Sequence, residues 1–142
     1  MKKIFALLLV VVASFSLSAC EGKSTSIDPT MWVISSIQST SDGVVTYCSA
    51  KEKDNFPEAD VRDISCNIDG STITIRNNET SEEWSGTYKL LDSNDERTIY
   101  EATIEGEKCQ AVKSVTEYEN GASTRDTLIL SCKDYVLNFF DK

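Results

Sequence analysis

The sequence predicts an all-β domain, folded as an antiparallel up-and-down meander of about eight or nine strands. Short segments rich in β-branched and aromatic residues recur along the chain, apolar and polar residues alternate within them, and turn-forming residues separate them. The connections are too short for crossover helices, so neighbouring segments should pair antiparallel and in sequence. Either a small closed barrel or a two-sheet sandwich would cover the apolar face. We favour the barrel because closure removes exposed edges.

Each expected strand is bounded by a turn signal or a polar loop. Ser41-Asp42-Gly43, Asp69-Gly70 and Asn120-Gly121 are turn sequences, and the latter two are typical of tight hairpins. The charged stretch 49–60 contains Pro57 and should form a loop with room for one helical turn. The expected strands are 31–38, 44–48, 64–68, 73–75, 84–90, 100–104, 109–118, 128–132 and 135–140.

The N-terminus carries an export signal. Lys2 and Lys3 precede an apolar run that ends in Leu17-Ser18-Ala19-Cys20, and this order matches the charged, apolar and small-residue regions of a signal peptide. The stretch resembles the lipobox of bacterial lipoproteins, which implies a signal helix over 1–19 and a lipid on Cys20 as the first mature residue. A membrane-spanning anchor would need a longer apolar run. Ordinary cleavage near Ala19 is the other alternative.

The resemblance also implies a location and a domain layout. Lipoproteins of this type carry a diacylglyceryl group and usually an added acyl chain, and two or more chains anchor a protein stably. Glu21 stands where aspartate would resemble the inner-membrane retention signal, so we expect the outer membrane. Residues 20–30 are polar and should form a flexible tether, followed by one β-domain over 31–142.

The chain is acidic, and this limits its partners. It has 23 acidic and 14 basic residues, with a net charge of −9, and loss of the signal removes two of the lysines. Nucleic acid is therefore excluded as a partner, because phosphate contacts need a basic patch. A cationic protein is a possible partner. The alternative is an acidic surface that only keeps the domain soluble.

Four cysteines remain once Cys20 is assigned to lipid, and an even number in an exported chain indicates disulfides. If Tyr118 pairs with Ser123 across the last hairpin, Cys109 and Cys132 lie directly opposite each other. Opposed Cβ atoms are about 4.5–5.5 Å apart, close to the disulfide range.

Cys48 and Cys66 would then form the second bridge and close the loop that contains Pro57. The other two pairings of the four cysteines stay open. A zinc site is the competing interpretation, but the chain has no Cys-x-x-Cys pair and no histidine.

No pattern in the chain indicates catalysis, a cofactor or a metal. The absence of histidine excludes Ser-His-Asp and Cys-His sites, and no glycine-rich phosphate loop occurs. The acidic pairs Glu82-Glu83 and Asp95-Glu96 fall in expected turns, where solvated surface is the simpler interpretation. Asp92, Asn94 and Glu96 have the spacing of calcium ligands but lack the glycine of that loop.

Aromatic residues are the remaining candidates for a binding site. Trp32, Trp84, Tyr88 and Tyr100 could line a ligand cavity, although aromatic residues more often fill the core of a small barrel. The meander with Trp32 in its first strand resembles a lipocalin-type barrel, but Thr30 replaces the glycine of the usual Gly-x-Trp.

Three functions fit this sequence. The leading hypothesis is a non-catalytic, lipid-anchored module that binds another protein, in the general format of lysozyme inhibitors, immunity proteins and exclusion lipoproteins. The second is a lipocalin-like carrier of a small apolar ligand. The third is a structural lipoprotein of envelope assembly.

Overall fold

The computed structural model describes residues 27, 30–117 and 124–142, and these form an all-β domain. The elements are β1 (Met31–Ser39), β2 (Val45–Cys48), the 3-10 helix η1 (Ala50–Glu52), β3 (Asp60–Val61), β4 (Ile64–Asp69), β5 (Thr72–Asn77), β6 (Glu83–Ser93), β7 (Arg97–Ile104), β8 (Glu107–Glu117), β9 (Thr124–Ser131) and β10 (Tyr135–Asp141). Among the described residues, no helix is long and apolar enough to cross a membrane.

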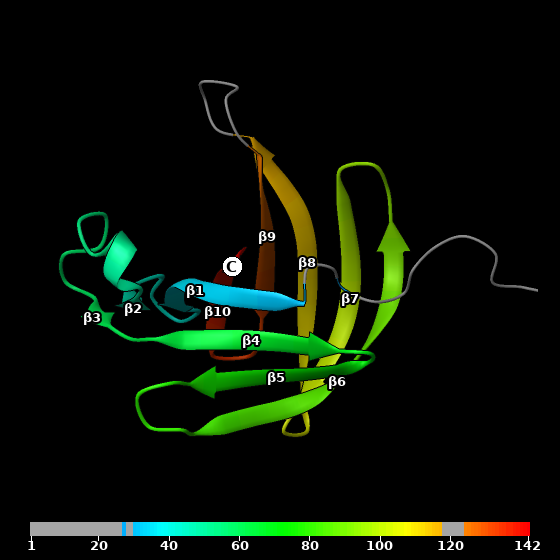
Figure 1. Ribbon diagram of the computed structural model, residues 1–142, viewed down its shortest axis with the longest axis horizontal. Helices are drawn as coiled ribbons and strands as arrows, with labels where there is room; N and C mark the ends of the chain where they lie inside the picture. The colour runs from blue at the N-terminus through cyan, green and yellow to red at the C-terminus, as the bar shows by residue number, and fades with distance from the viewer. Residues whose placement is uncertain (1–26, 28–29, 118–123) are drawn as a thin grey trace, which may run out of the picture.

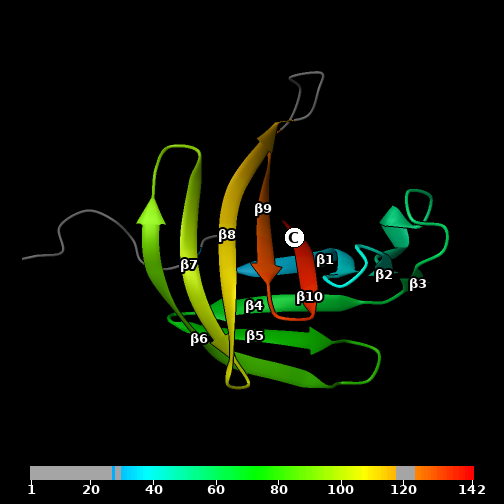
Figure 2. The same cartoon turned by 180° about the vertical axis from the view of Figure 1, so that it is seen from behind.

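Eight of the strands close into an antiparallel barrel, as predicted. Strands β4 to β10 pair in sequence, and β1 joins β4 to β10 and so completes the ring. Figures 1 and 2 show this barrel from opposite sides. Closure leaves no free edge along the ring, which is the advantage that favours a barrel over a sandwich.

Strand β1 departs from the simple meander. Its first half pairs with β4, its second half pairs with β2, and a bulge separates the two halves between Ile34 and Ser36. A bulge bends the strand and increases its twist, so the second half of β1 offers its edge to β2 instead. Strands β2 and β3, which pair in parallel, lie with η1 to one side of the barrel (Figure 1). The expected loop with one helical turn is confirmed by η1.

Every second side chain along the strands points inward, and these side chains fill the barrel. In β4, Ile64, Cys66 and Ile68 are buried while the intervening residues are more exposed, and β5 buries Ile73 and Ile75. The largest fully buried side chains are those of Trp32, Phe139, Ile27, Ile73, Leu128 and Leu130. Burying an aliphatic or aromatic side chain of this size stabilises the fold by about 1.5–3 kcal/mol.

Gly86 allows β6 to lie very close to its neighbour β7. It pairs with Ile104, and a Cβ atom at position 86 would overlap the backbone carbonyl of Thr103. Rotation of a side chain could not relieve that overlap, since the obstructing atoms belong to the backbone of β7. Glycine at this position therefore serves a close approach of two strands.

Ile27 closes one end of the barrel. Its side chain is 1% exposed, and its backbone N–H donates a hydrogen bond to the Tyr88 hydroxyl over 3.1 Å. That hydroxyl in turn donates to the carbonyl of Gly70 in the β4–β5 turn. The Tyr88 ring meets Tyr100 edge to face at 5.5 Å, and burial raises the pKa of Tyr100. We call this the closed end. The prediction of a flexible tether as far as Thr30 is wrong at Ile27, because this residue is packed into the barrel.

Two expected features lie outside the described residues. The first is the signal segment 1–19 with Cys20 and Glu21. The second is the Asn120-Gly121 turn with its flanking residues Tyr118 and Ser123.

Candidate functional site

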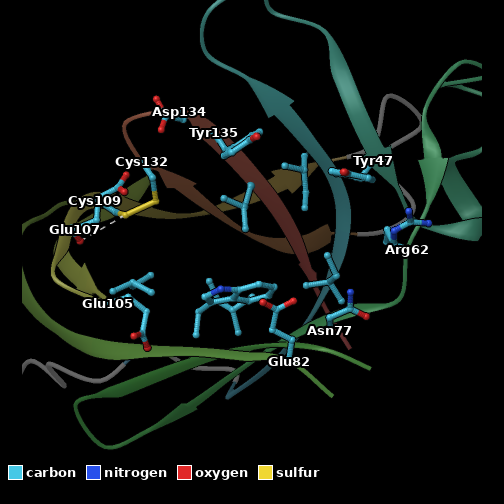
Figure 3. Close-up of a pocket in the computed structure, with 16 residues that line it drawn as sticks. Tyr47, Arg62, Asn77, Glu82, Glu105, Glu107, Cys109, Cys132, Asp134 and Tyr135 are labelled. Carbon is cyan, nitrogen blue, oxygen red and sulfur yellow. Dashed lines mark hydrogen bonds between the residues drawn. A yellow bond between two sulfur atoms is a disulfide. The ribbon is translucent and has the colours of Figure 1, made fainter. Parts of the chain in front are cut away.

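A cavity of about 530 Å³ opens at the other end of the barrel. Turns at the two ends of an up-and-down barrel alternate, so the β5–β6, β7–β8 and β9–β10 turns lie opposite the β4–β5 turn that adjoins Ile27. These three turns supply Glu82, Glu105 and Asp134 to the cavity (Figure 3). We call this the open end. Its volume falls in the range of small-molecule and side-chain pockets.

The floor of the cavity is apolar and comes from six different strands. Because alternate residues of each strand point inward, the last inward residue of each strand near this end faces the cavity. The floor residues are Ile37, Ile64, Ile75, Trp84, Ile104 and Leu137. Trp84 is partly buried and pairs with Ile75 across the β5–β6 ladder, so its position is fixed by the sheet.

The rim of the cavity is acidic. Sixteen residues line the cavity as a whole. Four of them carry carboxylates, which lie at the rim, and Arg62 is the one basic residue among the sixteen. The Arg62 guanidinium stacks 5.2 Å from the centre of the Tyr47 ring and lies 3.7 Å from the Asp60 carboxylate. Its charge is therefore already partly balanced. The rim carboxylates belong to Glu82, Glu105, Glu107 and Asp134.

Glu105 occupies an unusual backbone position. Glu105 and Gly106 have φ angles of +49° and +82°, the left-handed pair of a tight hairpin turn, where asparagine or glycine is preferred at the first position. The Glu105 carboxylate accepts a hydrogen bond from the Ser85 N–H over 2.9 Å, and the Glu105 N–H donates to the Ser85 carbonyl over 3.0 Å. The first bond holds the side chain against β6 at the edge of the cavity, and the second pairs the backbone of the turn with β6.

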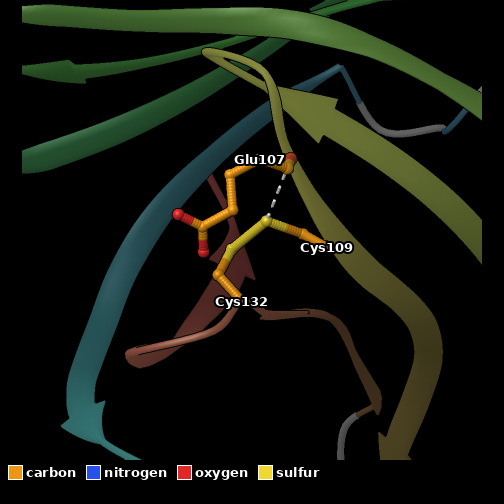
Figure 4. Close-up of side chains that lie close together, drawn as sticks. All are labelled: Glu107, Cys109 and Cys132. Carbon is orange, nitrogen blue, oxygen red and sulfur yellow. Dashed lines mark hydrogen bonds between the residues drawn. A yellow bond between two sulfur atoms is a disulfide. The ribbon is translucent and has the colours of Figure 1, made fainter.

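Glu107 is held beside a disulfide. Its carboxylate accepts a hydrogen bond from the Lys133 N–H over 2.8 Å. The neighbouring Cys109 and Cys132 are joined by a disulfide, with Cα atoms 4.4 Å apart (Figure 4). The predicted pairing is confirmed, because the β8–β9 ladder places Gln110 opposite Ser131, the register that brings the two cysteines together.

The same three residues form a possible metal cluster by distance alone. The ligand atoms of Glu107, Cys109 and Cys132 lie within 4.8 Å of one another. A metal binds cysteine as the thiolate, and here the two sulfurs are bonded to each other. The 3.9 Å approach of the Cys109 sulfur to the Glu107 carbonyl is a contact only, because a disulfide sulfur carries no hydrogen.

The expected Cys48–Cys66 bridge is absent. Both residues are fully buried free thiols, and burial raises the pKa of Cys66 to about 12. Cys48 lies opposite Ser36 and Cys66 opposite Trp32 on the same edge of β1. Four residues of strand span roughly 13 Å, well beyond the separation that a disulfide can bridge. The bulge that passes β1 from β4 to β2 thus keeps the thiols apart.

The structure separates the four candidate aromatic residues. Trp84 lines the cavity. Trp32, Tyr88 and Tyr100 belong to the buried core, with exposures of 0%, 7% and 3%. Sequence reasoning missed the aromatic residues Tyr47 and Tyr135, which lie across the cavity from Glu82 and Glu105 (Figure 3).

The other acidic motifs serve the turns. Asn94, in the expected calcium pattern, accepts hydrogen bonds from the Glu96 and Arg97 N–H groups over 2.9 Å each, and Asp92 accepts one from Ser93. These oxygens close the β6–β7 turn at the closed end. The sequence did contain a pattern from which the acidic rim could have been predicted. Its turn residues fall in every second turn of the meander, and every second turn lies at the same end of a barrel.

Comparisons with known proteins add no relative. The chain matches no protein-family model, no curated protein and no solved structure at a significant level. The cavity and its charge pattern therefore carry the functional proposal.

Proposed function

We propose that this protein is a non-catalytic, lipid-anchored protein of the bacterial cell envelope, more specifically of the outer membrane, that binds a partner protein at the open end of its barrel. The open-ended cavity, with its apolar floor and acidic rim, carries this proposal. Apolar area supplies binding free energy, and rim charges select and steer a partner of opposite charge. An inhibitor, immunity or exclusion protein would act in this way, by covering a functional surface of its partner.

Two features support the envelope location. Leu17-Ser18-Ala19-Cys20 resembles a lipobox, and the Cys109–Cys132 disulfide is typical of chains exported to an oxidising compartment. Metabolic labelling with a fatty acid should mark the wild-type protein, and a Cys20→Ser variant should leave the membrane fraction. A variant that still fractionates with membranes would contradict anchoring through Cys20.

Affinity capture tests the binding site. The full lipoprotein, solubilised with its own envelope, should retain a partner that a Trp84→Ala variant loses, because alanine removes the aromatic part of the cavity floor. Leu91→Ala is the matched control: Leu91 lies on the same strand but is 54% exposed and outside this cavity. Equal recovery with the wild type and both variants would place the partner elsewhere.

A second function is favoured by the same floor. A cavity of about 530 Å³ with Trp84 at its base also suits a lipocalin-like carrier of a small apolar ligand. Fatty acids or apolar dyes should then quench the fluorescence of Trp84 saturably. A Trp84→Phe variant, which retains only the fully buried Trp32, should lose that quenching. No quenching of the wild type would remove the carrier function.

A further inference from the structure

We infer that the open end of the barrel receives an arginine or lysine side chain of the partner, presented next to an apolar residue. This rests on the proposed binding function and names the chemistry that the site recognises. A basic side chain suits the site because its methylene groups pack on apolar surface while its charged head reaches outward. The rim carboxylates lie where that head would emerge.

The rim carboxylates lack cationic partners. Among the described residues, no lysine or arginine forms an ion pair with Glu82, Glu105, Glu107 or Asp134. The outer wall of the barrel differs: there the Glu101 carboxylate lies 3.0 Å from the Lys89 ammonium and 3.7 Å from that of Lys108. The hydrogen bond from Lys89 lowers the pKa of Glu101. Glu101 on the wall thus has two cationic neighbours, whereas none of the four rim carboxylates has one among the described residues.

Two of the rim carboxylates are already held in place. The Ser85 N–H binds one oxygen of Glu105, and the Lys133 N–H binds one oxygen of Glu107. Each hydrogen bond limits the freedom of the side chain before a partner arrives, so less conformational entropy is lost on binding. The second oxygen of each carboxylate remains to accept a hydrogen bond from a guanidinium or ammonium group.

Aromatic rings complete the environment of a cation. Trp84 lies on the floor, and Tyr135, which is 47% exposed, lies on the rim. An aromatic face attracts a cation within about 6 Å of its centre, and tryptophan does so most strongly. Tyr47 already has this contact with Arg62, at 5.2 Å. The cavity therefore offers two further aromatic rings near four carboxylates.

The probe for this inference is a capped, fluorescent peptide with one arginine between two leucines. The purified full lipoprotein in detergent should bind it saturably, and binding should weaken as salt rises from 50 to 300 mM, because salt screens exposed charges. A peptide with citrulline in place of arginine has the same shape without the charge, and its affinity should be roughly tenfold lower. Equal affinity for the two peptides would overturn the inference.

Charge-neutral variants locate the effect. Glu82→Gln combined with Glu105→Gln should weaken binding of the arginine peptide roughly five- to tenfold, about what two exposed charge pairs contribute. Glu96→Gln combined with Asp95→Asn is the matched control, since it removes the same charge from a turn at the closed end. Unchanged affinity in the rim variant, or an equal loss in both variants, would contradict recognition at the rim.

The same variants separate this inference from the proposed function. If the partner is lost with Trp84→Ala but kept with the doubly neutral rim variant, recognition of a basic side chain is overturned, while the open end stays the binding site. A partner kept by both variants would overturn the site itself. Unfolding curves of each variant show whether the barrel is retained, and Glu105→Asn provides a second rim variant with a residue that favours the turn.

Discussion

The two ends of the barrel are built by the same strands and differ in what meets them. At the closed end, Ile27 enters the core, its N–H is satisfied by Tyr88, and the Tyr88 and Tyr100 rings pack together. At the open end, no described segment covers the floor around Trp84, and carboxylates surround it. The closed end therefore adds to the core, whereas the open end leaves apolar surface available to a partner.

The largest expected effect comes from forcing apart β6 and β7, which link the two ends of the barrel and approach each other closely at Gly86. Gly86→Ala places a Cβ atom against the Thr103 carbonyl between β6 and β7, which must force the strands apart. We expect a loss of about 3 kcal/mol or more in unfolding free energy, at the upper end of the cost of overpacking, because the obstructing atom is backbone. Urea unfolding measures it. Thr87→Ala, on the exposed face next to it, should change little, and a stable Gly86→Ala protein would contradict the close approach.

The disulfide at the open end should matter almost as much. Replacing Cys109 and Cys132 by serine removes a link across 23 residues of chain, which should cost about 3 kcal/mol of unfolding free energy.

The two free thiols should be chemically protected. In the wild type, Cys48 and Cys66 should resist iodoacetamide until the protein unfolds, because both are buried. Mass spectrometry counts the modified thiols. Protection of four thiols after unfolding without reductant would contradict the single bridge.

The raised pKa of Cys66 adds a pH dependence. The folded state keeps the thiol protonated up to about pH 12, whereas an unfolded cysteine ionises near 9.0. The unfolded state therefore releases a proton first as pH rises, and the contribution of this thiol to stability is complete below pH 9 and is lost between 9 and 12. A Cys66→Ala variant should show a weaker loss of stability over that window, measured by thermal unfolding at successive pH values.

Truncating one side chain at each end sharpens the comparison. Ile27→Ala should cost about 2 kcal/mol or more of unfolding free energy, because it leaves a cavity in the closed end. Trp84→Ala should cost less, since its side chain is only partly buried, yet it should abolish partner capture. Thermal unfolding and capture are measured on the same samples. A larger stability loss for Trp84→Ala would assign it to the core.

The smallest effect is expected at the rim. Glu105→Asn puts a residue that tolerates a positive φ angle at a position where Glu105 has +49°, so unfolding free energy should stay within about 1 kcal/mol of the wild type or rise. Binding of a basic peptide should nevertheless weaken. A loss of stability above that range would mean that the bond from Ser85 to the Glu105 carboxylate outweighs the strain of the turn.

Local patterns predicted much of the fold. Alternation identified the strands, and the register of one hairpin placed Cys109 opposite Cys132. The Cys48–Cys66 bridge failed because the bulge in β1 is a local irregularity that no hydrophobic pattern announces. Ile27 was missed because a single apolar residue in a polar stretch has no periodicity. The acidic rim was missed because its residues are distant in sequence and meet only through the alternation of turns.

The position of Ile27 has a consequence for orientation. Cys20 and Ile27 are seven positions apart, and a fully extended chain of that length spans at most about 25 Å. With lipid on Cys20, as proposed, the closed end would be held within that distance of the bilayer surface. The open end lies opposite this point of attachment, so the acidic rim would be turned away from the membrane and toward partners in the aqueous phase.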